Sequence, residues 1–102
     1  MSDLVEFLEA RIDDDEYDAN RELLLGTTTV LTRMNSRILA ECAAKRAVIV
    51  LAQKAAEAER EFDDYEWQGT VKRREPLAGD AILYALAAVY KDHPDYQEEW
   101  AA

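Results

Sequence analysis

Residues 27–68 contain neither glycine nor proline, and this uninterrupted stretch constrains the fold more than any other feature of the sequence. Both residue types break helices, so their absence allows one helix to run the length of the stretch. The whole chain has only three glycines and two prolines in 102 residues. An antiparallel sheet with many tight turns needs more of both, which argues against an all-β sandwich or barrel.

Apolar side chains recur along this stretch at helical spacing. A segment of four apolar residues within it, 48–51, could by itself form a buried strand. The segments on either side are rich in alanine, glutamate and lysine, which favours helix. We therefore predict one helix over residues 29–65, roughly 55 Å long at the usual helical rise. Its apolar stripe consists of Leu31, Met34, Ile38, Cys42 and Ile49.

Two shorter helices are predicted on either side of the long one. Apolar residues at four-residue spacing mark the first, and the second follows a segment that contains two glycines and a proline. Asp80 is the predicted N-cap of the second helix, and Pro94 is the predicted start of a last short turn. In chain order, the predicted elements are a helix over residues 3–25, the long helix 29–65, a loop 68–79, a helix 80–91 and a turn 94–100.

Residues 1–102 are expected to form a single all-α domain. The predicted architecture is an elongated helical hairpin with one very long central helix plus a C-terminal helix. The two shorter helices can cover only part of the long one, so a monomer would leave an apolar stripe in water. We therefore expect a homodimer. Its interface is predicted to consist of the four residues that point in different directions around the long helix, Val48, Ile49, Val50 and Leu51.

Charge is distributed in blocks along the chain. There are 22 acidic and 12 basic residues, which gives a net charge of -10 at pH 7. Residues 1–22 hold nine acids and two bases, whereas residues 23–60 hold three acids and six bases. The acidic run Asp13–Glu16 is therefore expected either to form a solvated acidic face or to pair with Arg33 and Arg37. The overall negative charge disfavours direct binding to nucleic acid.

The N-terminal region does not resemble a targeting signal. It is acidic, whereas a secretory signal begins with basic residues and continues with about 7–15 apolar ones. The longest strongly apolar run, residues 47–52, is far shorter than the roughly 20 residues of a membrane-spanning helix. We expect a cytoplasmic protein with no membrane partner. One free cysteine is consistent with a reducing compartment.

Cys42 and His93 are the obvious candidates for chemistry. Cys42 lies in the middle of the long helix on its apolar stripe, so it is predicted to be a core residue and not a nucleophile. His93 has four carboxylates near it in the sequence, which could bind a metal weakly. The Asp-His-Pro sequence favours a local turn instead. The four carboxylates are those of Asp92, Asp95, Glu98 and Glu99.

Three charged clusters also require interpretation. Glu57, Glu61 and Asp64 share one helix face, as magnesium-binding carboxylates do in all-α nucleotide pyrophosphohydrolases. Such sites take paired sets from two helices, and only one set is present here. The run at residues 13–16 lacks the spacing of a calcium loop, and the basic run at residues 72–74 is too short to indicate nucleic-acid binding. We therefore predict no catalytic residue, no cofactor and no metal.

The C-terminal aromatic residues are predicted to anchor the end of the chain. Tyr96 and Trp100 are four residues apart and would share a face of a short helix. Pro94 would direct this face back onto the helices, where Tyr90 is also expected to pack. We predict that Tyr90, Pro94, Tyr96 and Trp100 form an anchor and not a ligand pocket.

Two motifs at opposite ends of the chain suggest a relationship. Residues 3–11 read D-L-V-x-F-L-x-A-R, and residues 92–100 read D-H-P-D-Y-x-x-E-W. Together with Glu41, Ala44–Arg46 and the Val48-Ile49 pair, they make the chain resemble an uncharacterised family of small acidic proteins from actinobacteria and their phages. This resemblance implies a bacterial or phage cytoplasmic context, and it implies no activity, cofactor or catalytic residue.

The expected function is that of a small non-enzymatic acidic interaction protein, such as a phage or bacterial accessory factor that binds a host protein. Two alternatives remain open. The first is an acidic inhibitor of a nucleic-acid-binding protein. The second is a metal-dependent hydrolase that uses His93 and the nearby carboxylates.

Overall fold

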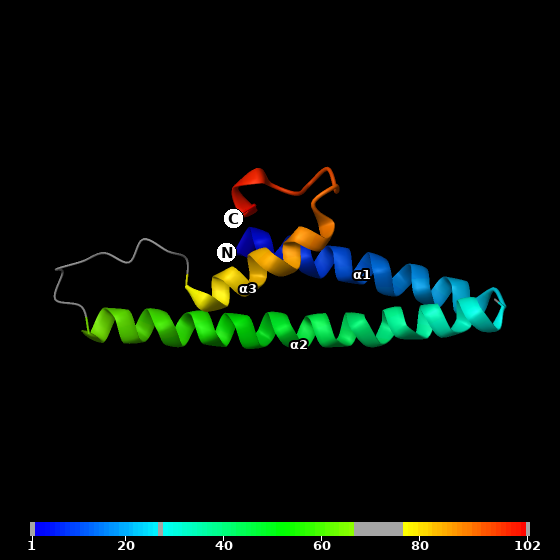
Figure 1. Ribbon diagram of the computed structural model, residues 1–102, viewed down its shortest axis with the longest axis horizontal. Coiled ribbons are helices and arrows are strands. Elements are labelled where there is room, and N and C mark those ends of the chain that lie inside the picture. The colour runs from blue at the N-terminus through cyan, green and yellow to red at the C-terminus, as the bar shows by residue number, and fades with distance from the viewer. Residues whose placement is uncertain (1, 27, 67–76, 102) are drawn as a thin grey trace.

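The computed structural model describes residues 2–26, 28–66 and 77–101, which form a helical rod (Figure 1). The molecule measures 61 × 24 × 18 Å along its principal axes. Within the described ranges there is no strand, so the all-α prediction is confirmed. None of the described helices has both the length and the hydrophobicity needed to cross a membrane. The elements are α1 (Ser2–Leu24), α2 (Thr29–Glu66), α3 (Ala78–Ala87) and the 3₁₀ helices η1 (Ala88–Tyr90) and η2 (Glu98–Trp100).

The long central helix is present as a single element. α2 runs from Thr29 to Glu66, within one residue of the predicted bounds. Its buried residues include Asn35, Cys42, Ile49 and Ala56, a seven-residue repeat that keeps one side of the helix facing the core.

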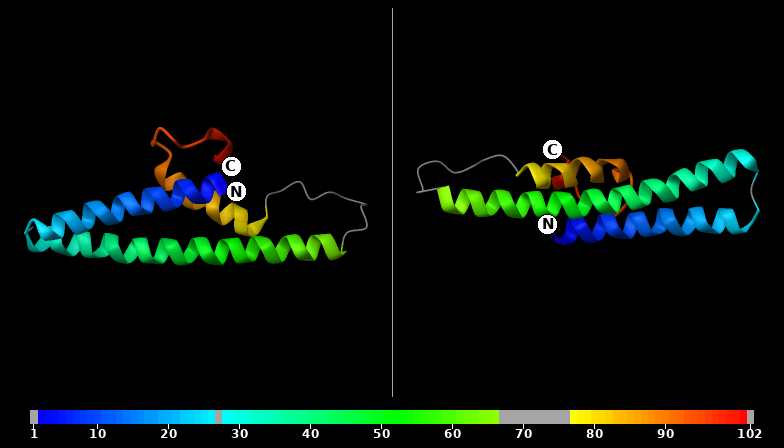
Figure 2. Two further views of the ribbon diagram at one scale, coloured as in Figure 1. Left: turned by 180° about the vertical axis from the view of Figure 1, so that it is seen from behind. Right: turned by 90° about the horizontal axis from the view of Figure 1, so that it is seen from below.

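The apolar side chains of α2 that lie near the turn of the hairpin are exposed. Leu31 and Met34 were predicted on the apolar stripe, but both side chains are exposed. The reason is the position of α3, which packs against the middle of α2 and does not reach the turn (Figures 1 and 2). Only α1 covers α2 there, and one helix cannot bury the full apolar stripe of another.

α1 packs antiparallel against α2, as predicted. The Cys42 thiol donates a hydrogen bond to the Ile12 carbonyl oxygen over 3.7 Å. Farther along α2, Arg46 donates to Asp13 and Glu16, each over 2.7 Å. The acidic run of α1 therefore lies level with residues 42–46 of α2.

The predicted pairing of this acidic run with Arg33 and Arg37 is wrong. Arg46 pairs with Asp13, and Arg11 pairs with Asp14 over 3.1 Å. An antiparallel hairpin brings residues into register by their distance from the turn, and Arg33 and Arg37 lie too close to it. Both are exposed, and neither pairs with any residue that the structure describes.

α3 begins two residues before its predicted start, because another helix caps it. The backbone N–H groups of Ala78 and Gly79 each donate to a carboxylate oxygen of Glu59 over 3.0 Å. The predicted N-cap, Asp80, lies inside the first turn, and its carboxylate is 3.8 Å from the Arg60 guanidinium. Glu59 thus satisfies two N–H groups that would otherwise lack partners at the helix end.

Gly79 marks the point where α3 crosses α2. Predicted to lie in a loop, it is buried in the first turn of α3. A Cβ atom at this position would lie 2.2 Å from the Ala52 carbonyl oxygen and 2.8 Å from Ala56 Cβ. Glycine and two alanines therefore permit the close approach of the two helices. Most of the predicted loop 68–79 lies outside the described residues.

The C-terminal segment folds back over the start of α1 (Figure 2). The predicted helical turn over residues 94–100 is wrong in its backbone, since only Glu98–Trp100 forms a 3₁₀ helix. Pro94 lies in a turn, where the N–H of Tyr96 donates to the His93 carbonyl oxygen over 3.0 Å. The chain reverses here instead of starting a new helix.

Candidate functional site

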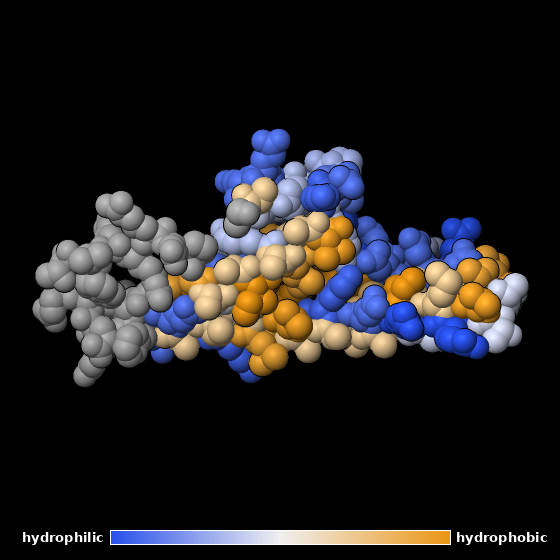
Figure 3. Space-filling view, in the orientation of Figure 1, coloured by the Kyte–Doolittle hydropathy of each residue, from blue (hydrophilic) through white to orange (hydrophobic). Residues whose placement is uncertain are grey.

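The most prominent feature of the surface is a group of exposed apolar side chains on α2 and α3. Figure 3 shows hydrophobic residues gathered over α3 and the middle of α2. Leu51 is 65% exposed and Val48 is 38% exposed; on α3, Val89 is 64% exposed and Ile82 is 43% exposed. We call Val48, Leu51, Ile82 and Val89 the apolar face.

The predicted interface residues do not all belong to this face. Ile49 is only 2% exposed and packs in the core, so its assignment to the interface is wrong. Val50 is exposed but lies two positions from Val48, a rotation of about 200° around the helix. Of the four residues, the structure thus brings together Val48 and Leu51, and α3 adds two that were not predicted.

The C-terminal anchor is built around Phe7, which the sequence analysis did not single out. The Phe7 ring centroid lies 5.0 Å from that of Trp100 and 6.2 Å from those of Tyr90 and Tyr96. Trp100 is buried and also contacts Tyr96 at 5.6 Å. Three predicted anchor residues therefore pack together, whereas Pro94 is exposed and only shapes the turn.

Tyr90 links all three helical layers through its hydroxyl group. The hydroxyl donates to the Asp15 carboxylate over 3.0 Å and accepts from the Lys45 ammonium over 3.1 Å. Burial raises the pKa of Tyr90, and the interaction with Asp15 raises it further. Burial opposes protonation of Lys45, but the bond to Tyr90 and the charge of Asp15 outweigh it, so the pKa of Lys45 also rises. Neither group is poised to exchange a proton at neutral pH.

His93 is held within the C-terminal turn. Its Nδ1 atom accepts from the Arg11 guanidinium over 3.1 Å and from the Asp95 N–H over 3.0 Å. The ring packs edge-on against Phe7 at 5.6 Å. Among the described residues, no group of three or more His, Cys, Asp or Glu side chains is arranged to hold a metal ion. The geometry is that of the predicted local turn.

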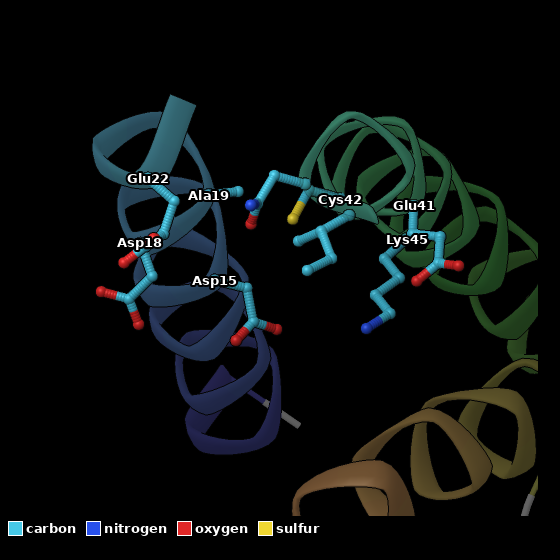
Figure 4. A pocket seen from close by; sticks show the side chains of 9 residues that line it. Asp15, Asp18, Ala19, Glu22, Glu41, Cys42 and Lys45 are labelled. Atoms are coloured by element: carbon cyan, nitrogen blue, oxygen red, sulfur yellow. The ribbon is translucent and has the colours of Figure 1, made fainter. Parts of the chain in front are cut away.

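A hollow of about 300 Å³ separates α1 from α2 beside Cys42 (Figure 4). The hollow arises where the facing residues, Ala19 and Cys42, are too small to fill the space between the helices. Burial and the charge of Asp15 raise the pKa of the Cys42 thiol. A protonated, buried thiol is a poor nucleophile. The lining residues are Asp15, Asp18, Ala19, Glu22, Asn35, Ile38, Glu41, Cys42 and Lys45.

The remaining charged clusters show no assembled site in the part of the chain that is described. Glu57 and Glu61 are exposed on α2, as expected for a solvated face. The Asp64 side chain and the basic run at residues 72–74 lie outside the described part.

Comparison with known protein families identifies the family of this chain. A family model described as a family of unknown function, DUF6221, matches residues 1–102. The chain belongs to DUF6221. The resemblance to an uncharacterised domain family is thereby confirmed over the full span of the chain. Membership of DUF6221 assigns no reaction, so any function must be argued from the surface. No curated protein and no solved structure matches the chain significantly.

Proposed function

We propose that this DUF6221 protein is a non-enzymatic, cytoplasmic interaction protein that acts as a homodimer and offers its acidic surface to another protein. The apolar face of α2 and α3 carries the proposal. Its four large side chains are exposed on a small rod whose own core uses other residues. Apolar surface left in water costs about 25 cal/mol per Å² relative to burial, so a second molecule that covers it is strongly favoured.

Exposed carboxylates on α1 support the proposal that an acidic surface binds another protein. Glu6, Glu9, Asp18 and Glu22 are all exposed, and none of them forms an ion pair with a described residue. Such groups suit a partner with a basic surface. The resemblance to proteins of actinobacteria and their phages favours an accessory factor that acts on a host protein.

Light scattering coupled to size-exclusion chromatography tests the dimer. We expect a mass near twice 11.6 kDa at micromolar protein. Leu51→Glu should yield a monomer with unchanged helicity, because the charge would be buried without a partner. Val50→Glu, on the other side of α2, is the matched control and should remain dimeric. A wild-type mass near 11.6 kDa would contradict the proposal.

The exposed carboxylates of α1 also support a second candidate, an acidic inhibitor of a nucleic-acid-binding protein. Such a protein would compete with DNA for a basic surface, and its binding would weaken sharply with salt. The test is displacement of a labelled duplex from a basic host protein. Glu6→Lys combined with Glu9→Lys should abolish displacement, whereas the interaction protein of the first proposal need not displace DNA at all.

A further inference from the structure

α2 carries opposite charge on its two halves. Residues 29–47 hold four basic residues and one acidic residue, whereas residues 52–66 hold two basic and six acidic residues. Between these halves lies the apolar segment that contributes Val48 and Leu51 to the apolar face. The helix is therefore a rod with a positive half, an apolar middle and a negative half.

The unpaired basic residues share a side of the helix with the apolar face. Residues 4, 11 or 15 positions apart lie on the same side of an α-helix, and this spacing relates Arg33, Arg37 and Val48. Leu51 follows Val48 by three positions. Arg33 and Arg37 are exposed and form no ion pair with any described residue. The same side of α2 thus offers both apolar contact and unused positive charge.

We propose that the occupant of the apolar face is a second copy of this chain whose α2 packs antiparallel on the first, about a two-fold axis near Val48 and Leu51. The inference rests on the proposed homodimer and specifies its arrangement. Antiparallel packing sets the end of each α2 that carries Arg33 and Arg37 against the end that contains Asp63 and Glu66 in the other copy, while parallel packing would set the arginines of the two copies against each other.

The available area is sufficient for a stable dimer. The two-fold axis relates Arg33 of one copy to residue 66 of the other, so the paired stretch of α2 is about 50 Å long at the usual helical rise. α3 lies beside it and adds Ile82 and Val89 to the contact. On a molecule 24 Å across, such a strip covers on the order of 1,000 Å² per copy, which is enough for a specific interface.

Disulfide trapping tests the arrangement, because an antiparallel and a parallel dimer bring different pairs of residues from the two copies together. In the antiparallel dimer Ala44 of one copy faces Ala55 of the other, while the two Ala44 residues lie about 16 Å apart along the helix. A disulfide needs Cα atoms within about 7 Å. Ala44→Cys and Ala55→Cys, each in a Cys42→Ala background, are oxidised separately and as an exchanged equimolar mixture.

We expect covalent dimers only in the mixture, and they should contain one chain of each variant. Covalent dimers of Ala44→Cys with itself would establish the parallel arrangement and overturn the inference. The absence of any cross-link in a protein of dimeric mass would likewise overturn it, since another face would then form the dimer. A monomeric mass for the wild-type protein would instead refute the proposed homodimer itself.

Charge reversal provides a second measurement that needs no new cysteine. Arg33→Glu combined with Arg37→Glu should raise the dimer dissociation constant about tenfold, because it opposes two negative regions. Arg21→Glu, an exposed change on α1, is the control and should leave the constant unchanged. Equal dissociation constants for the double variant and the wild type would overturn the inference.

Discussion

A few single residues join segments that are far apart in the chain. Glu59 of α2 caps α3, and Tyr90 bridges Asp15 and Lys45 with one hydroxyl group. Gly79 allows α3 to contact α2 closely because it has no side chain. The Ala52 carbonyl oxygen occupies the space where a Cβ atom would lie. Each of these residues acts through its tertiary neighbours and not through its local helix propensity.

Gly79→Ala should therefore destabilise the protein. In an exposed helix the same change stabilises by about 1 kcal/mol. Here the added methyl group must separate α3 from α2, and such overpacking costs about 1–3 kcal/mol or more. Gly26→Ala is the comparison, because a Cβ atom there meets nothing within 4 Å and only its positive φ of 74° opposes the change. A higher Tm for Gly79→Ala than for the wild type would contradict the close crossing of α3 and α2 at this residue.

Stability should decrease in alkaline solution. The pKa values of Tyr90, Cys42 and Lys45 are all raised in the folded protein. The unfolded chain therefore loses these protons at lower pH than the folded chain does, and unfolding is favoured as the pH rises. We expect the Tm to fall from about pH 9, where an ordinary thiol ionises, towards pH 11.

Tyr90→Phe provides the control for this pH dependence. The variant should be less stable at neutral pH, because Asp15 and Lys45 lose their shared partner. Its Tm should nevertheless decline less steeply above about pH 9, since one of the shifted groups is gone. A decline as steep as that of the wild type would show that Tyr90 does not contribute to the alkaline transition.

At the level of the elements, α2 is the support on which the others pack. α1 covers α2 from the turn to its middle, whereas α3 crosses only the middle of α2 (Figure 1). The C-terminal segment contacts α1 through Phe7 and closes the core over that contact. The short η2 helix owes its position to the aromatic contacts of Trp100, because three residues cannot form a stable helix by themselves.

Trp100→Ala should release this segment. The side chain is only 6% exposed, and truncation of a buried tryptophan costs about 3–5 kcal/mol. We expect a large fall in Tm, partly restored by Trp100→Phe, which keeps an aromatic ring against Phe7. Val89→Ala, at an exposed site, should change the Tm little at a protein concentration where the molecule is monomeric. An unchanged Tm for Trp100→Ala would show that the segment does not support the core.

At the level of the whole molecule, the rod exposes much surface for its size. It is 61 Å long and only 18 Å thick in its shortest direction. Such a shape has few deeply buried positions, and within the described ranges the apolar core is one cluster around Leu8, Ile12 and Leu83. A small domain of this kind has modest stability by itself, and association adds to it.

The melting temperature should therefore depend on protein concentration. A homodimer that dissociates on unfolding becomes more stable as concentration rises. We expect the Tm of the wild type to increase across a hundredfold range of concentration, whereas that of Leu51→Glu stays constant. A concentration-independent Tm for the wild type, measured where light scattering reports a dimer, would mean that the two copies do not stabilise each other.

The helical class, the hairpin and the extent of α2 could be predicted from the sequence. These follow from local rules: the absence of glycine and proline over residues 27–68, and apolar spacing close to the helical period. The burial of Cys42 and the contact between Tyr96 and Trp100 were also predictable from pattern. The backbone conformation between these two residues differs from the prediction, because Pro94 turns the chain instead of starting a helix.

The rotation of the helices and the points where they cross depend on contacts between the helices. Helical spacing placed Ile49 on the stripe with Cys42, but Val48, Val50 and Leu51 are similarly hydrophobic, so no local rule shows which of these sides of α2 stay exposed. That choice depends on which side of α2 meets α1 and α3. The Glu59 cap and the Gly79 crossing likewise arise between helices. Packing free energy depends on contacts between residues distant in the chain, and the spacing of residues along one helix does not encode them.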